Sequence, residues 1–168
     1  RIEGSDNPFG RHEDGYDILE GGQGDDVLVG GTNNPGSGGY IIDLYRFADN
    51  SGDDIILGFL IDGTGWQGGP YLDRIEIINN VNNSGIDSAQ DILDAATENE
   101  DGWAVLDLGS GNTVTFHGVS PNELKEHHFE IITQEEFDTL LEQSSIAAAN
   151  SFGGGTMGDD PSISDESY

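Results

Sequence analysis

Two segments rich in glycine and aspartate lie nine residues apart near the start of the sequence. Residues 21–29, GGQGDDVLV, match the pattern G-G-x-G-x-D-x-U-x, where U is a large apolar residue, at every defined position. Residues 12–20, HEDGYDILE, keep Gly15, Asp17 and Leu19 at the matching positions. Glycine permits tight turns that aim backbone carbonyls inward, and aspartate adds carboxylate oxygens. Hard oxygen ligands without nitrogen or sulfur favour Ca²⁺, which accepts about six to eight of them, so this pattern predicts calcium binding.

These residues resemble the glycine-rich nonapeptide of the RTX, or hemolysin-type, calcium-binding proteins. The resemblance implies stacked turns of a parallel β-roll that bind calcium between them. It implies six ligands in two successive turns: the Glu13 and Gly15 carbonyls with the Asp17 carboxylate, then the Gly22 and Gly24 carbonyls with the Asp26 carboxylate. The alternative is a glycine-rich acidic loop that binds nothing in particular.

Further aspartates keep only part of the pattern. Asp43 lacks the glycine two residues before it, whereas Gly52 does lie two residues before Asp54. We predict Asp43 and Asp54 to be calcium ligands or remnants of ligands, and Asp73 is a weaker candidate. The spacings between successive aspartates of the series are 9, 17 and 11 residues, so the regular repeat is expected to end after the second turn.

The composition is strongly acidic. The 168 residues carry 33 Asp and Glu against 5 Lys and Arg, a formal charge of −28. This charge excludes nucleic acid and anionic membrane surfaces as partners, and it opposes compaction unless cations bind. There is no cysteine and no apolar run of the ~20 residues that crosses a bilayer. Disorder of the whole chain is the competing interpretation, but short patterned apolar runs argue against it in the presence of calcium.

Other segments carry local signals of strands, turns and helices. The patterns predict a strand at 72–78, a hairpin of 103–108 and 113–119, and short helices that start after Ser88, Ser120 and Thr133. Three parts follow: a calcium-binding roll at 1–47, a β-rich capping region at 48–131, and an amphipathic helix with a flexible acidic tail at 132–168. The predicted fold class is all-β, a short parallel β-roll followed by a β-rich capping region with two or three short helices.

The residues from Asp43 to Phe59 and from Leu72 to Ile77 resemble the segment after the roll in secreted RTX proteins. The segment from Leu106 to Ile132 is similar to the C-terminal region of serralysin-type proteases and related type I-secreted proteins. The resemblance covers roughly residues 12–131. It implies that this region caps the roll and that a signal near the C-terminus addresses the protein to a type I secretion channel. The chain begins at Arg1 without methionine, so we expect it to be processed or excised from a longer protein.

No signal for catalysis accompanies the calcium pattern. The motifs H-E-x-x-H and G-x-S-x-G are absent, so the protease of the serralysin resemblance is not expected here. The four histidines, at His12, His117, His127 and His128, have no metal-ligand spacing and are interpreted as solvated or packing residues. We expect no enzyme activity.

The function expected from the sequence is a calcium-binding RTX module at the C-terminal end of a larger exported bacterial protein. It would pass through the type I secretion machinery unfolded and fold outside the cell, where calcium is abundant. Two clear repeats are fewer than the roughly three that usually bury a shared core. The alternative is therefore a subunit or anchoring module of a calcium-dependent extracellular assembly, such as an adhesin, surface layer or filament, that self-associates through the open end of the roll.

Overall fold

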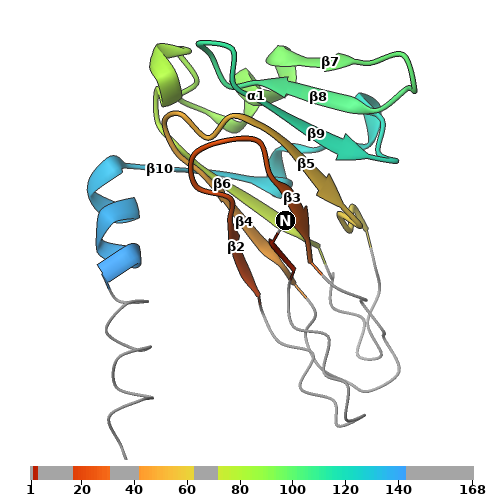
Figure 1. The fold of residues 1–168 in the computed structure, drawn as a ribbon. Coiled ribbons are helices and arrows are strands. Elements are labelled where there is room, and N and C mark those ends of the chain that lie inside the picture. The colour runs from red at the N-terminus through yellow and green to blue at the C-terminus, as the bar shows by residue number, and fades with distance from the viewer. Residues whose placement is uncertain (1, 4–16, 31–41, 63–71, 143–168) are drawn as a thin grey trace, which may run out of the picture. The chain divides into compact units, whose positions relative to one another are not determined.

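The computed structural model describes residues 2–3, 17–30, 42–62 and 72–142 (Figure 1). The chain divides into two compact units, Arg1–Gln134 and Glu135–Tyr168. The described part of the second unit is helical up to residue 142, as the helix prediction after Thr133 requires. The acidic tail predicted beyond this helix lies outside the described residues.

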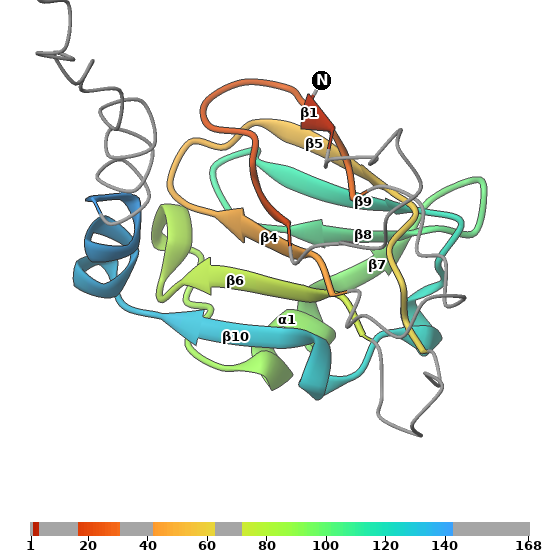
Figure 2. The same ribbon diagram turned by 90° about the horizontal axis from the view of Figure 1, so that it is seen from below.

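The described strands of the first unit form two sheets, which Figure 2 shows as two layers. The six-stranded sheet has the order β1 (Ile2–Glu3), β3 (Val27–Val29), β5 (Asp53–Leu57), β9 (Thr113–His117), β8 (Ala104–Asp107) and β7 (Ala96–Glu98). The four-stranded sheet has the order β10 (Phe129–Ile132), β6 (Arg74–Ile78), β4 (Leu44–Phe47) and β2 (Ile18–Glu20).

The chain crosses from one sheet to the other as it runs from β2 to β6. Every pair in the four-stranded sheet is parallel, and so are the pairs that link β1, β3, β5 and β9. The β9–β8 and β8–β7 pairs are antiparallel. The antiparallel β8–β9 pair confirms the predicted hairpin, and β6 confirms the predicted strand.

The core forms because the strands alternate buried and more exposed side chains, the period of two that a sheet imposes. Leu28, Ile56 and Phe116 supply fully buried side chains from the six-stranded sheet, and Tyr45 and Ile75 from the other. Each such side chain contributes about 1.5–3 kcal/mol by leaving water. Apolar burial therefore holds the two layers together.

Helical segments interrupt the run between β6 and β10: η2 (Val81–Asn83), α1 (Ala89–Ala95), η3 (Pro121–Glu123) and η4 (Glu126–His128). Helix α1 begins where predicted, because the Ser88 hydroxyl accepts the Asp91 amide at 3.2 Å. The segment after Ser120 is a three-residue 3₁₀ turn, in which Glu123 accepts the Ser120 amide at 2.8 Å.

The predicted fold class, an all-β chain with a short parallel roll and a separate β-rich cap, is wrong. The fold has mixed α/β character, with one parallel sheet, one mixed sheet and helices. Parallel pairing also continues past residue 47, because β3 pairs with β5 and β4 with β6. The physical reason is that parallel pairing needs alternating apolar residues but not the glycines of the nonapeptide, so the end of the repeat does not end the sheets.

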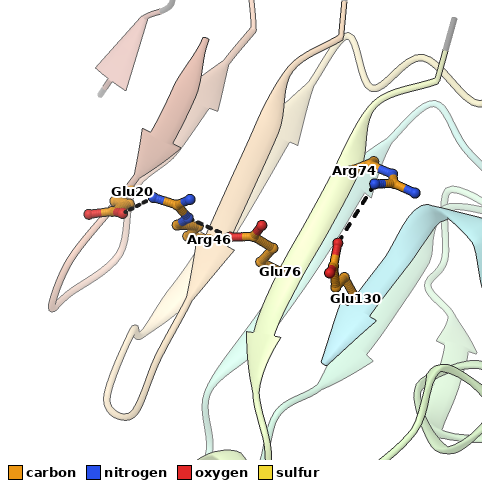
Figure 3. Close-up of polar contacts among 5 residues, drawn as sticks. All are labelled: Glu20, Arg46, Arg74, Glu76 and Glu130. Atoms are coloured by element: carbon orange, nitrogen blue, oxygen red, sulfur yellow. Dashed lines mark hydrogen bonds and ion pairs between the residues drawn. The ribbon is translucent and has the colours of Figure 1, made fainter. Parts of the chain in front are cut away.

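The outer face of the four-stranded sheet carries an in-register row of charges (Figure 3). Arg46 lies between two glutamates, with its Nε 2.5 Å from Glu76 and its Nη1 3.3 Å from Glu20. The Arg46 side chain is only 4% exposed. A second pair, Arg74 with Glu130 at 3.7 Å, has both side chains 53% exposed. Because Arg46 is buried and Arg74 is exposed, we expect their ion pairs to contribute different amounts to the free energy of unfolding.

We predict that Arg46→Met lowers the free energy of unfolding by roughly 3 kcal/mol, because it leaves two partly buried carboxylates without their counter-charge. The matched variant Arg74→Met should cost no more than about 1 kcal/mol, since water already screens its ion pair. Urea unfolding of both variants measures the difference. Equal shifts would show that burial of Arg46 does not determine the strength of its ion pairs.

Candidate functional site

Asp17, Asp43 and Asp73 each lie directly before a strand of the four-stranded sheet. Strand register aligns the residues that follow them, because Leu44 is paired with both Ile18 and Arg74. The Leu44 amide donates to the Asp17 carbonyl at 2.8 Å, and the Arg74 amide donates to the Asp43 carbonyl at 2.9 Å. Neighbouring strands lie about 4.8 Å apart, so this register forms a row of three aspartates, called here the first aspartate row.

The central carboxylate of the first row is buried without hydrogen bonds. Asp43 is 1% exposed, and neither of its carboxylate oxygens has a hydrogen-bond partner among the described residues. Burial, together with the nearby Asp73 and Asp17 charges, raises the pKa of Asp43 to about 7. The Asp17 amide offsets part of this rise, although it does not reach hydrogen-bonding geometry with either oxygen. A buried carboxylate in this state needs a proton or a cation.

Asp73 differs from Asp43 because the backbone satisfies both of its oxygens. It accepts the Asp43 amide at 3.0 Å and the Leu60 amide at 2.8 Å. Its side chain is fully buried, and burial raises its pKa to about 6 against the opposing effect of these amides. Asp73 thus fixes the backbone at Asp43 while it contributes negative charge to the row.

The wall of the Asp43 site requires glycine and carries a second polar group. A Cβ atom at Gly30 would overlap Asp43 Oδ2 and the Tyr45 hydroxyl oxygen. That hydroxyl is buried and has no hydrogen-bond partner among the described residues. Tyr45 therefore places one more oxygen beside the carboxylate, and Gly30 allows the backbone to close over both.

A second aspartate row lies at the start of strands in the six-stranded sheet. Pairing of Val27 with Ile55 aligns Asp26 with Asp54, and the Asp26 amide donates to Asp54 Oδ1 at 2.9 Å. Asp54 is 1% exposed, and its Oδ2 has no hydrogen-bond partner among the described residues. Its pKa rises to about 6 because of burial, which the Asp26 amide partly offsets, and because of the carboxylates of Asp26, Asp25 and Asp53.

Glycines shape the turns that lead into this second row. Gly22, Gly24 and Gly52 have φ values of 80°, 104° and 96°, in the left-handed region that favours glycine. A Cβ atom at Gly52 would lie 2.5 Å from the Gly24 carbonyl oxygen, so the two turns stack closely.

Six of the eight ligands predicted from the sequence lie within the described residues: Asp17, Gly22, Gly24, Asp26, Asp43 and Asp54. Glu13 and Gly15 lie outside them. The fold pairs Asp17 with Asp43, and Asp26 with Asp54, in different sheets. Asp73 was only a weaker candidate, although it shares with Asp17, Asp26 and Asp43 the signal of an aspartate directly before a strand. No sequence signal marked Tyr45 or Gly30.

The oxygen atoms of the two rows are chemically suited to calcium, but the side chains alone do not complete its coordination shell. No group of three aspartate, glutamate or histidine side chains within the described ranges is arranged to hold one metal ion. Carboxylates of the two rows supply only oxygen, which suits a hard cation. A calcium ion at either row would need backbone carbonyls and water to complete its shell of about six to eight oxygens.

His128, the buried member of the two adjacent histidines, has a packing role. His128 is fully buried, its Nδ1 accepts the Lys125 amide at 2.9 Å, and its Nε2 lies 2.9 Å from the Ile61 carbonyl. This pattern fits a neutral ring with the proton on Nε2, and burial lowers its pKa. His127 is exposed. The pair therefore does not converge on a metal.

A scan against models of protein families finds no match, and a search of curated proteins finds no significant one. In the part of the chain that the structure describes, no helix has both the length and the apolar character needed to cross a bilayer. The chemistry of the two aspartate rows therefore follows from the residues that form them.

We predict that the metal-free protein becomes less stable as pH rises from about 4 to about 7. In that window the unfolded chain has already released the Asp43 proton, whereas the folded state, with a pKa of about 7, still holds it. Folded protein therefore binds more protons, and each unit of rising pH removes stability, to a total on the order of a few kcal/mol. Far-UV circular dichroism in a chelator between pH 4 and pH 8 measures this slope as a fall in the folded fraction of the protein with rising pH.

The variant Asp43→Asn should flatten the slope, and the exposed control Asp62→Asn should leave it unchanged. Asp54 and Asp73, each with a pKa raised to about 6, should account for the part that remains in Asp43→Asn. A wild-type slope retained in full by Asp43→Asn would contradict the assignment of the buried charge to Asp43.

Proposed function

We propose that this chain is a calcium-binding module whose folding is driven by calcium. The observation that carries the proposal is the pair of aspartate rows, in which Asp43 and Asp54 bury carboxylate oxygens that have no partner among the described residues. Leaving such a group unsatisfied costs several kcal/mol, and a bound cation removes the cost. Calcium is the biological cation best matched to carboxylate and carbonyl oxygens in an irregular shell.

The net charge strengthens this argument. At −28, the compact chain repels itself, and each calcium ion cancels two charges where they are densest. A ligand that binds only the folded state stabilises it by about 2.7 kcal/mol at a hundredfold excess over its Kd. Several such sites match a total folding stability on the order of 5–15 kcal/mol. Calcium concentration therefore sets whether the chain folds.

The resemblance of residues 12–31 to RTX nonapeptides supports an extracellular setting for this switch. The chain would stay unfolded where calcium is scarce, pass through a type I secretion channel and fold outside the cell. In this view it is the C-terminal part of a larger exported bacterial protein and has no enzyme activity of its own. The second unit, which contains the predicted amphipathic helix, would then carry the secretion signal.

One observation supports a second candidate function, a subunit of a calcium-dependent extracellular assembly. Strand β2 is the edge of the four-stranded sheet among the described strands, and its Ile18 is 43% exposed. An open edge with an exposed apolar residue can pair with another chain. Sedimentation that shows a monomer at every calcium and protein concentration would exclude this assembly while leaving calcium binding intact.

A calcium titration followed by far-UV circular dichroism tests the main proposal. We predict a transition from coil to β structure that calcium produces and magnesium does not, because magnesium demands a regular octahedral shell and keeps its water. A chain that is already fully folded in chelator at neutral pH or above would contradict calcium-driven folding.

We further predict that Asp54→Asn raises the calcium concentration at the transition midpoint by about tenfold or more, since affinity depends on the number of charged ligands. Asp62→Asn is the matched control, an exposed aspartate outside both rows, and should shift the midpoint little. Isothermal titration calorimetry on both variants gives the stoichiometry and affinity. Equal midpoints for the two variants would remove Asp54 from the site.

A further inference from the structure

The outer face of the six-stranded sheet carries a band in which apolar side chains outnumber polar ones, unlike the charged row on the outer face of the other sheet. Register places one row of outward side chains across five strands, from β3 to β7: Val27, Ile55, Thr115, Val105 and Thr97. A second row, two residues further along the parallel strands, contains Val29, Leu57 and His117. The Trp103 ring extends this second row, with its centroid 4.1 Å from that of His117. These two rows are called here the apolar band.

Solvent reaches the apolar band. Ile55 is 37% exposed, and every other member is at least partly exposed. Isolated surface apolar residues are ordinary, but a contiguous band of this kind marks an interaction surface. The band therefore has the composition of a docking site rather than of a solvated sheet face.

An acidic row borders the band on one side. Thr113 is paired with Asp53 and with Asp107, and the Asp25 carboxylate accepts the Asp53 amide at 3.0 Å. All three aspartates are exposed. Among the described residues of β3, β5, β9, β8 and β7 there is no lysine or arginine to neutralise them. The border therefore favours a cationic partner.

The dimensions of the band match a single helix lying across the strands. Strands lie about 4.8 Å apart, so a row across five strands is roughly 19 Å long. The two rows are about 6.7 Å apart along the strands, and with their side chains they make a strip roughly 10 Å wide. An α-helix is about 10–12 Å in diameter and rises 1.5 Å per residue, so about 14 residues cover the strip.

We propose that the apolar band docks an amphipathic helix of a partner protein, with apolar residues on the docked face and Lys or Arg along the flank beside the acidic row. Apolar contacts supply the affinity, and the aspartates fix the direction in which the helix lies. A second copy docked through the same band is a poor occupant, because it would bring its own acidic row to this surface.

The experiment uses the full chain in millimolar calcium and two labelled 14-residue peptides. One is an amphipathic helix of Leu and Lys, and the other has the same composition in scrambled order. Fluorescence anisotropy should show the amphipathic peptide binding at least about tenfold tighter than the scrambled one, because only the ordered pattern presents a continuous apolar face. Equal affinities would overturn the proposal, since they would show attraction by charge alone.

Two surface variants place the binding on the band. The double variant Ile55→Ser with Val105→Ser should abolish the preference for the amphipathic peptide, and Asp107→Asn should weaken its binding and reduce its dependence on salt. The matched control Ile18→Ser, an exposed isoleucine of the other sheet, should change neither. Circular dichroism in calcium confirms that each variant is folded.

Two outcomes would assign the surface differently. A preference that survives the double variant would place the peptide elsewhere on the chain. A dimer detected by sedimentation in wild type and lost in the double variant would make a second copy the occupant. Either result overturns the proposal without bearing on calcium binding, which the peptide does not measure.

Discussion

Parallel register is the constraint on which the site depends. In a parallel sheet, residues at equivalent positions of successive strands fall in line, so aspartates at or just before the starts of those strands form rows. Asp17, Asp43 and Asp73 line up in this way, as do Asp26 and Asp54. The hydrogen bonds and apolar contacts that build the core thus also force like charges together. Stability and the demand for a cation arise from the same arrangement.

The described strands of the four-stranded sheet contain two arginines, Arg46 and Arg74, and both form their ion pairs on its outer face. Arg46 is held between two glutamates, and Arg74 pairs with a third. Burial and neighbouring carboxylates raise the pKa of Asp43 and of Asp54, and only backbone amides oppose this rise. The described arginines therefore stabilise the fold and do not neutralise the aspartate rows, whose buried carboxylates need ions or protons.

Elements that depend on residues close together in the sequence were predicted correctly, whereas pairings between distant strands were not. The Ser88 cap and the β8–β9 hairpin depend on residues close together in the sequence, so residue types and spacing predict them. The continuation of the sheets beyond the repeat depends on pairs such as β5 with β9, which no local pattern encodes. Tyr45 and Gly30 were missed for the same reason, since they meet Asp43 only after the strands have stacked.

The same long-range pairing has a kinetic consequence. Asp53 is paired with Thr113, and Phe129 with Ile75, so the chain must close loops of more than 50 residues before these strands can meet. Loop closure costs entropy before any contact compensates for it, and parallel sheets fold slowly as a result. Carboxylates that repel one another raise that barrier further until cations screen them. The folding rate, as well as the affinity for cations, then determines how long the chain stays unfolded. A newly made chain remains extended and accessible to proteases for a long interval before its sheets are complete.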